Sequence, residues 1–244
     1  MQSPAVYDAM ATLNESLTYP TNRDDWYRTI IIGGVLMLFS FLLIPLFLAY
    51  GYMVRVMRSR LAREPDLPEF SDWGTLLVDG VKVWIIGLVY LLIPLIVAGV
   101  TIGGSIMSMA TGTESGAAIG LAGLFGGLFV SFLLAVIFWY LAVASIVNFA
   151  RTDSFGAAFD VETIKSVIFN SNYATGWAIG LVVIIAAGII GGLLNAIPLL
   201  GFIIASFIAF YALIVAAILW TDGFEASFAR GEIGETPTTD DPAV

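Results

Sequence analysis

Long stretches of this sequence contain no charged residue, and this limits the possible folds more than any other feature. Asp, Glu, Lys and Arg are absent from four intervals: Thr29–Val54, Val83–Thr113, Ser115–Ala150 and Ser166–Thr221. Each interval exceeds the roughly 20 apolar residues that a helix needs to cross a hydrocarbon core of about 30 Å. Only 12% of the 244 residues are charged, about half the share in soluble domains. The sequence therefore predicts an all-α integral membrane protein, a polytopic helical bundle.

The uncharged intervals predict about five transmembrane helices inside a transmembrane domain over residues 29–221. We expect these spans at residues 29–54, 81–105, 121–147, 177–195 and 199–220. A polar segment over 1–28, able to form a short amphipathic helix, precedes them. It lacks the basic start and cleavage site of a signal peptide. An acidic tail over 222–244 follows, with an interfacial start and a disordered end.

Basic residues predict the orientation, because short loops rich in Arg and Lys face the cytoplasm. The first two expected spans are separated by five basic residues, Arg55, Arg58, Arg60, Arg63 and Lys82, and the third and fourth by two, Arg151 and Lys165. Five spans then place the N-terminus outside and the C-terminus in the cytoplasm of a multi-pass cell-membrane protein.

Two arginines before the first span, Arg23 and Arg28, argue against this orientation. The alternative is a cytoplasmic N-terminus, with one apolar run turning back as a re-entrant hairpin. The first run contains Gly33, Gly34 and Pro45, and the third run is long enough to hold a glycine-rich turn.

An internal repeat joins spans to amphipathic segments. A shift of 93 positions aligns Arg58 with Arg151 and Trp84 with Trp177, and Thr152–Phe159 resembles Thr221–Phe228. In each unit a span ends, a polar break follows, an amphipathic helix lies on the membrane surface, and a tryptophan begins the next span. We expect such interfacial helices at about 71–83 and 154–172, since Trp and Arg favour the headgroup zone.

The expected helix at 71–83 begins at Ser71 as N-cap and carries Trp73 and Trp84 on one face and Asp79 on another. It serves either as a membrane anchor or as a surface that binds a partner. The residues expected to set topology or bind at the interface are Arg55, Arg58, Arg60, Arg63, Trp73, Asp79, Trp84, Arg151 and Trp177.

Three stretches resemble a known family: Trp26–Gly34, Gly51–Arg58 and the run PEFSDWGTLLVDG at Pro68–Gly80. They are similar to an archaeal membrane-protein family, common in halophiles, called domain of unknown function 4013. The resemblance extends over about Asp8–Gly231. It implies fold and lineage and brings no catalytic residue. An acidic chain with eight Arg and two Lys also suits a halophile.

The sequence contains neither Cys nor His, which excludes thiol and imidazole catalysis and zinc sites built on those ligands. A net charge of −9 argues against nucleic acid as a partner. No expected span has an ionisable residue at its centre, the usual mark of a proton path. The densest acidic group is Glu64, Asp66, Glu69, Asp72 and Asp79, and it matches no metal-binding loop. We therefore expect no catalytic residue, cofactor or metal.

Glycines four residues apart allow close helix packing, within the chain or between copies; the pairs are Gly116 and Gly120, Gly123 and Gly127, and Gly188 and Gly192. The sequence favours a non-enzymatic scaffold whose partners are the lipid bilayer and another membrane protein or a second copy. One alternative is a channel or facilitator for a small or lipidic solute. Another is a metal-assisted lipid-headgroup enzyme that uses the acidic group.

Overall fold

The computed structural model describes residues 12–232, with side chains through residue 228. Residues 12–18 are helical and a 3-10 turn follows at Tyr19–Thr21. The main helices are α2 (Trp26–Leu38), α3 (Ile44–Leu61), α4 (Trp73–Met109), α5 (Glu114–Thr152), α6 (Val161–Ile168), α7 (Ser171–Leu194) and α8 (Leu200–Glu232). The described residues contain no strand, and four helices are long and apolar enough to cross a membrane. The predicted all-α membrane bundle is confirmed.

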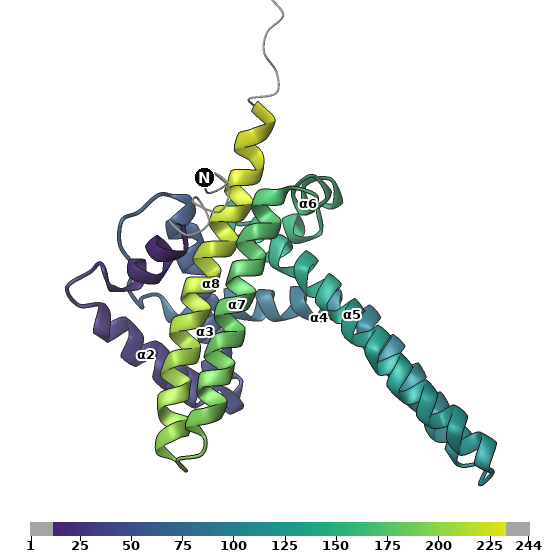
Figure 1. Cartoon of the computed structure of the whole chain (residues 1–244). Helices are drawn as coiled ribbons and strands as arrows, with labels where there is room; N and C mark the ends of the chain where they lie inside the picture. The colour runs from purple at the N-terminus through teal and green to yellow at the C-terminus, as the bar shows by residue number, and fades with distance from the viewer. Residues whose placement is uncertain (1–11, 233–244) are drawn as a thin grey trace, which may run out of the picture.

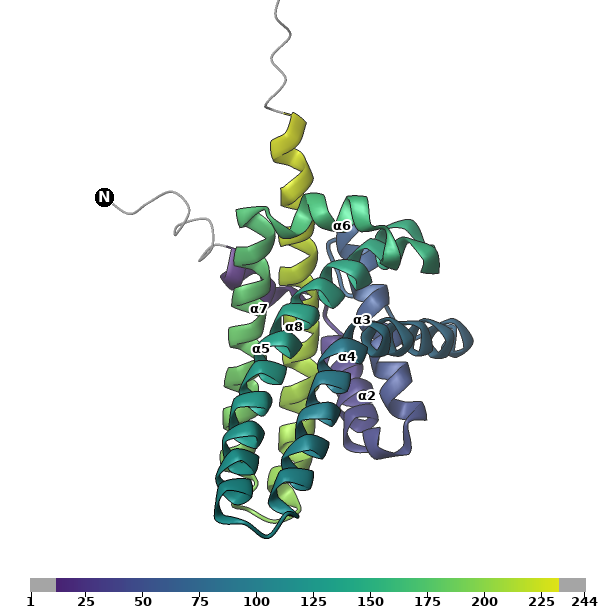
Figure 2. The ribbon, with the colours of Figure 1, turned by 90° about the vertical axis from the view of Figure 1, so that its right-hand side faces the viewer.

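The helices form three hairpins, α2–α3, α4–α5 and α7–α8, whose turns all point the same way (Figures 1 and 2). The opposite ends of the hairpins gather around the C-terminal end of α3. The α4–α5 hairpin leaves this junction at a steep angle to α7–α8, and we call it the α4–α5 arm (Figure 1). With 37 and 39 residues, α4 and α5 are each about 55–60 Å long at 1.5 Å per residue, so a tilt brings them closer to bilayer thickness.

The first apolar run does not form the single span expected over 29–54. Helix α2 ends at Leu38, a 3-10 turn occupies Ser40–Leu42, and Leu43 adopts a positive φ of 63° before α3 begins. Pro45 lies in the first turn of α3, where its missing N–H removes no helical hydrogen bond. With 13 residues, α2 is only about 20 Å long. The run folds back on itself, as in the re-entrant alternative.

The other expected spans lie within α4, α5, α7 and α8, but the interfacial helices differ from expectation. Residues 71–83 are not a separate helix, because α4 is unbroken from Trp73 to Met109 and is capped by Asp72 rather than Ser71. Its first turns lie across the bundle and the rest runs beside α5 (Figure 2). Residues 154–172 comprise a 3-10 helix η3 (Phe155–Phe159), α6 and the first residues of α7. Helix α8 continues well past residue 220.

The predictions for residues 1–11 and 233–244, including the disordered tail, lie outside the described residues.

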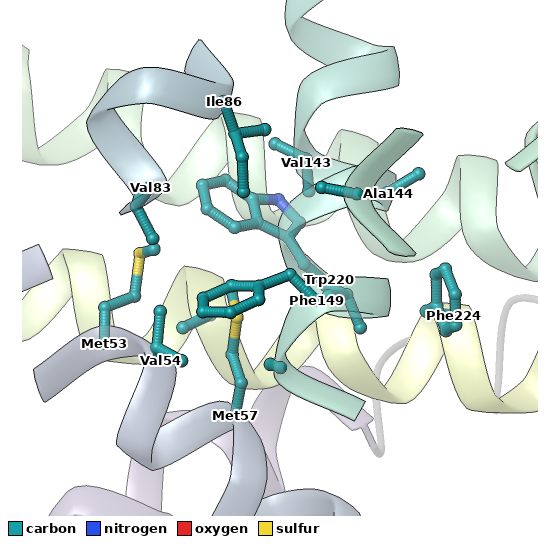
Figure 3. Close-up of a cluster of buried hydrophobic side chains, with 14 of the residues drawn as sticks. Met53, Val54, Met57, Val83, Ile86, Val143, Ala144, Phe149, Trp220 and Phe224 are labelled. Atoms are coloured by element: carbon teal, nitrogen blue, oxygen red, sulfur yellow. The ribbon is translucent and has the colours of Figure 1, made fainter. Parts of the chain in front are cut away.

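A buried hydrophobic cluster joins the three hairpins near their gathered ends (Figure 3). It includes Met53 and Met57 from α3, Ile86 from α4, Val143 from α5 and Trp220 from α8. Figure 3 shows these side chains converging from separate helices. The cluster fixes the base of the α4–α5 arm, while the outer half of the arm packs only on itself.

Glycines permit the closest helix contacts. Cβ atoms on Gly51 and Gly80 would overlap the backbone carbonyls of Leu76 and Phe47, so α3 and α4 cross in direct backbone contact. The expected packing glycines Gly116, Gly120, Gly123 and Gly127 all face α4 or the turn that joins it to α5. By contrast, a Cβ added at Gly188 or Gly192 would have no neighbouring atom within 4 Å, so the expectation of packing within the chain is wrong for this pair.

Candidate functional site at the charged end

Charged side chains from all three hairpins meet where α3 ends. We call this region the charged end; it consists of the arginines of α3, Arg63 just after it, and the charged groups that pair there. Its members are Glu15, Arg55, Arg58, Arg60, Arg63, Asp79, Lys82, Asp153 and Asp222. Arg58 and Arg60 lie in the last turn of α3, where cations interact favourably with the helix dipole. Each of these two arginines reaches a different hairpin.

Arg58 connects α3 to both helices of the α4–α5 arm at its base. It donates hydrogen bonds to Asp79 of α4 at 2.5 Å and to Asp153, which caps α5, at 2.7 Å. Asp79 is only 3% exposed and has a second cation, Lys82, at 3.5 Å. Arg58 and Lys82 both lie over the ring of Phe149. A buried carboxylate is thus satisfied by two cations, which offsets its desolvation.

Arg60 connects α3 to α8. Its Nε and Nη2 donate to the two carboxylate oxygens of Asp222 at 2.7 and 3.0 Å, and Nη2 also donates to Glu15 at 2.8 Å. The hydrogen bonds to Asp222 raise the pKa of Arg60 above its ordinary value. Because Glu15 and Asp222 share one arginine, the first and last described parts of the chain lie at the same end of the bundle.

The other predicted basic residues have separate contacts. Arg55 donates to the carbonyls of Glu69 and Ser71 and so holds the loop between α3 and α4. Arg151 bonds Asn148 and lies 4.7 Å from the ring centre of Phe228. Arg63 adopts a positive φ of 57° just after α3.

The three predicted tryptophans do not share one surface. Trp73 is exposed and stacks on Phe70. Trp84 packs edge-on against Phe47, and Trp177 packs against Trp139 and Tyr140 inside the bundle. The structure places them at the start of α4, at the base of the arm and against the core, and their predicted interfacial role stays a prediction.

Sequence analysis missed the carboxylates that pair with the arginines. Asp153 and Asp222 occupy equivalent places in the similar segments Thr152–Phe159 and Thr221–Phe228, and they pair with Arg58 and Arg60, two residues apart on α3. The shared Thr-Asp pair was therefore the available signal. Only a three-dimensional structure shows which arginine each aspartate meets.

Two cavities of about 310 and 450 Å³ lie on either side of the Arg60 pair and share Glu15, Arg60 and Asp222 in their walls. The smaller extends along α7 and α8 beside Gly176, and the larger is bounded by the loop after α3, including Arg63 and Glu64. The charged end therefore has accessible polar cavities beside the ion pairs of Arg60 with Asp222 and Glu15.

The acidic group of the sequence is dispersed in the structure. Glu64 accepts a hydrogen bond from Ser59, Glu69 pairs with Arg23, Asp72 caps α4, and Asp79 pairs with Arg58. Within residues 12–232, no three acidic side chains converge as metal ligands.

Comparison with family models gives a match over residues 38–196, more than half of the chain and less than the range expected from the sequence motifs. The matching family carries the description "Protein of unknown function (DUF4013)". Comparisons with curated proteins and with solved structures gave no match. The matched residues run from the turn between α2 and α3 to the turn between α7 and α8. This chain, with its three hairpins and its charged end, belongs to the DUF4013 family.

Proposed function

We propose that the protein is a non-catalytic membrane scaffold that docks another membrane protein on the segment formed by η3 and α6. The observation that carries the proposal is an apolar surface outside the long helices. Val161 is 74% and Phe169 is 81% exposed, while Ile164 and Val167 fix the other face of α6 to the core. Exposed apolar groups rimmed by polar residues are typical of protein interaction sites.

The charged end supports this role by making the docking platform rigid. Segment η3–α6 directly follows Asp153, which Arg58 holds, and Tyr90 of α4 donates to the carbonyl of Ala158 in η3. A partner bound there would meet a preorganised surface, which lowers the entropic cost of association. We also propose that this end faces the cytoplasm, because it carries the basic residues of the interhelical loops.

The test is purification from native membranes in mild detergent, with quantification of every co-purifying protein. The docking variant is Val161→Ser with Phe169→Ser. The matched control is Val100→Ser with Met107→Ser, two equally exposed residues on the arm. We expect a stoichiometric protein partner with the wild type and the control, and its loss from the docking variant. Absence of any stoichiometric protein from the wild type, or its retention by the docking variant, contradicts the proposal.

A further inference from the structure

A cavity of about 480 Å³ lies between the turn of the α2–α3 hairpin and the lower half of α7–α8. We call it the tip cavity. The hairpin contributes Met37 and Ser40. The walls from α7 and α8 are made mainly of small residues, including Ala187, Gly188, Gly192, Ala205 and Ala209. The cavity is amphipathic, with Asn195 closing the end nearest the α7–α8 turn.

The short hairpin explains why this space exists. Helix α2 is about 20 Å long, so the α2–α3 turn ends before the level of the α7–α8 turn (Figure 1). The turn exposes Phe39, Phe41, Leu42 and Leu43. Below it, the small residues of α7 and α8 supply no side chains to fill the gap. A re-entrant hairpin that enters from the charged end therefore leaves the opposite leaflet unfilled at this place.

The medium around the cavity is hydrocarbon. Its α7 and α8 walls lie inside Ser166–Thr221, which contains no charged residue. Both helices are long and apolar enough to span a bilayer. An apolar space of this size in a bilayer is within the 300–1,000 Å³ range of small-molecule sites. Its natural occupant is an acyl or isoprenoid chain rather than water, because apolar walls do not hold water.

Polar side chains at the cavity can hydrogen-bond the polar part of a lipid, which a simple hydrocarbon lacks. Among the described residues, neither the Ser40 hydroxyl nor the Asn195 amide has a hydrogen-bond partner in the chain, whereas Ser206 donates to the carbonyl of Phe202. Asn195 is the first residue of the uncharged turn 195–199, at the end of the molecule opposite the arginines. An amide in this position can bond the ester, ether or phosphate oxygens of a lipid whose chain extends toward Ala212.

We propose that the tip cavity is a binding site for one lipid of the leaflet opposite the charged end, with its chain along Gly188 and Gly192 and its polar group at Asn195. The site is independent of the scaffold function, because it uses the opposite end of the molecule.

The test uses the full-length protein in nanodiscs of phosphatidylcholine that contain a trace of phosphatidylcholine with a diazirine in one acyl chain. After photolysis, mass spectrometry locates the cross-linked residues. Gly188→Phe fills the cavity, and Gly103→Phe is its matched control on α4, because both glycines have open space at Cβ. We expect the cross-links to be concentrated on residues 184–212 in the wild type and in the control. In Gly188→Phe the cross-linking yield on these residues should be at least about tenfold lower. Ala209→Leu, from α8, provides a second filling variant should Gly188→Phe fail to fold.

Asn195→Ala separates the polar contact from the cavity. It should weaken cross-linking while leaving the thermal unfolding midpoint unchanged. Equal cross-linking of α4 and of 184–212, or cross-linking that neither filling variant reduces, overturns the proposal. So does a change in oligomeric state on filling the cavity, because it would show that a second copy occupies the site.

Discussion

Asp72 and Asp160 each cap a helix and are each held by a threonine three residues later. The hydroxyl and amide of Thr75 donate to Asp72, and those of Thr163 donate to Asp160. The hydrogen bond from each threonine hydroxyl is the main cause that lowers the pKa of its carboxyl below the ordinary value. Both carboxylates therefore stabilise the start of a helix more strongly when they are ionised.

This predicts a pH effect that Asp72→Asn and Asp160→Asn should reveal, because Asn can still cap but carries no charge. The folded pKa values lie below the unfolded value of about 3.9. The contribution is therefore fully present above that value and is lost as pH falls through the folded pKa. The wild type should unfold at a higher temperature than either variant at pH 7, and the difference should shrink as the pH falls below about 3.9. Asp24→Asn, at an exposed position, is the control. A difference that does not shrink at acidic pH would rule out the charge as its cause.

Asp79 and Arg58 should be energetically coupled, because the carboxylate is buried between two cations. Asp79→Leu leaves Arg58 and Lys82 without their shared partner, and Arg58→Met leaves Asp79 with Lys82 alone. Breaking a buried pair typically costs about 3–5 kcal/mol. In a double-mutant cycle measured by denaturant unfolding in detergent, we expect a coupling free energy of about 1–3 kcal/mol. Asp79→Leu with Lys165→Met should be additive, and strict additivity of the Arg58 pair would contradict the ion-pair role.

At the scale of the element, the crossing of α3 and α4 depends on two glycines. Cβ atoms at Gly51 or Gly80 would overlap backbone atoms, which cannot rotate away as a side chain does. Gly51→Ala and Gly80→Ala should each lower the free energy of unfolding by about 2 kcal/mol or more. Gly87→Ala, in α4 with open space at Cβ, should be neutral or stabilising by about 1 kcal/mol, since Ala has the higher helix propensity. Thermal unfolding in detergent compares the three; equal midpoints would mean that α3 and α4 do not cross this closely.

The positions of the long helices could be predicted from the sequence because hydropathy alone identifies them. Uncharged intervals located α4, α5, α7 and α8, because length and apolar composition determine a span. The turn at Phe39–Leu43 was not localised, because its residues are apolar except Ser40 and the nearby Gly33 and Pro45 lie inside helices. The tripeptide Ile-Pro-Leu follows this turn at 44–46 and forms part of the α7–α8 turn at 197–199, where Leu199 also has a φ of 63°. A third copy at 93–95 lies inside α4, so the tripeptide was only a partial signal.

The candidate site was predicted only in its parts. Basic residues after a span identified Arg58 and Arg60, but periodicity carries no information on how one hairpin packs against another. Their partners Asp153 and Asp222 lie 95 and 162 residues away. The internal repeat from which those aspartates could be aligned remains a prediction.

For the whole molecule, three hairpins place both ends of the described chain on one side. Glu15 and Asp222 meet at Arg60, and four helices are long and apolar enough to cross a membrane. If these four helices cross and the α2–α3 hairpin turns back, we expect an even number of crossings. Arg23 and Arg28 before α2 would then lie on the same side of the membrane as the arginines of α3, without the conflict that an external N-terminus creates.

The topology can be tested cleanly because the chain contains no cysteine. Single cysteines at Arg63, Gly112, Ala196 and Leu42 should report the charged end, the two far turns and the α2–α3 turn. In sealed vesicles, a membrane-impermeant maleimide should label Arg63→Cys from one side and Gly112→Cys and Ala196→Cys from the other. Leu42→Cys should react slowly from either side. Rapid labelling of Leu42→Cys from the side that labels Gly112→Cys would mean that α2 and α3 both cross the membrane, and it would contradict a hairpin that turns back inside the bilayer.

The placement of all three turns at one end also has a consequence for biosynthesis. Residues 110–113 and 195–199, the turns of the two long hairpins, carry no charge. Charged residues at mid-membrane cost about 2.5–3.5 kcal/mol each during translocon-mediated insertion. Glu114, the first residue of α5, adds one carboxylate beside the first of these turns. Each long hairpin can therefore enter the bilayer as a unit that carries at most one charged residue across, and in the proposed orientation every arginine-bearing segment stays on the side from which the chain enters.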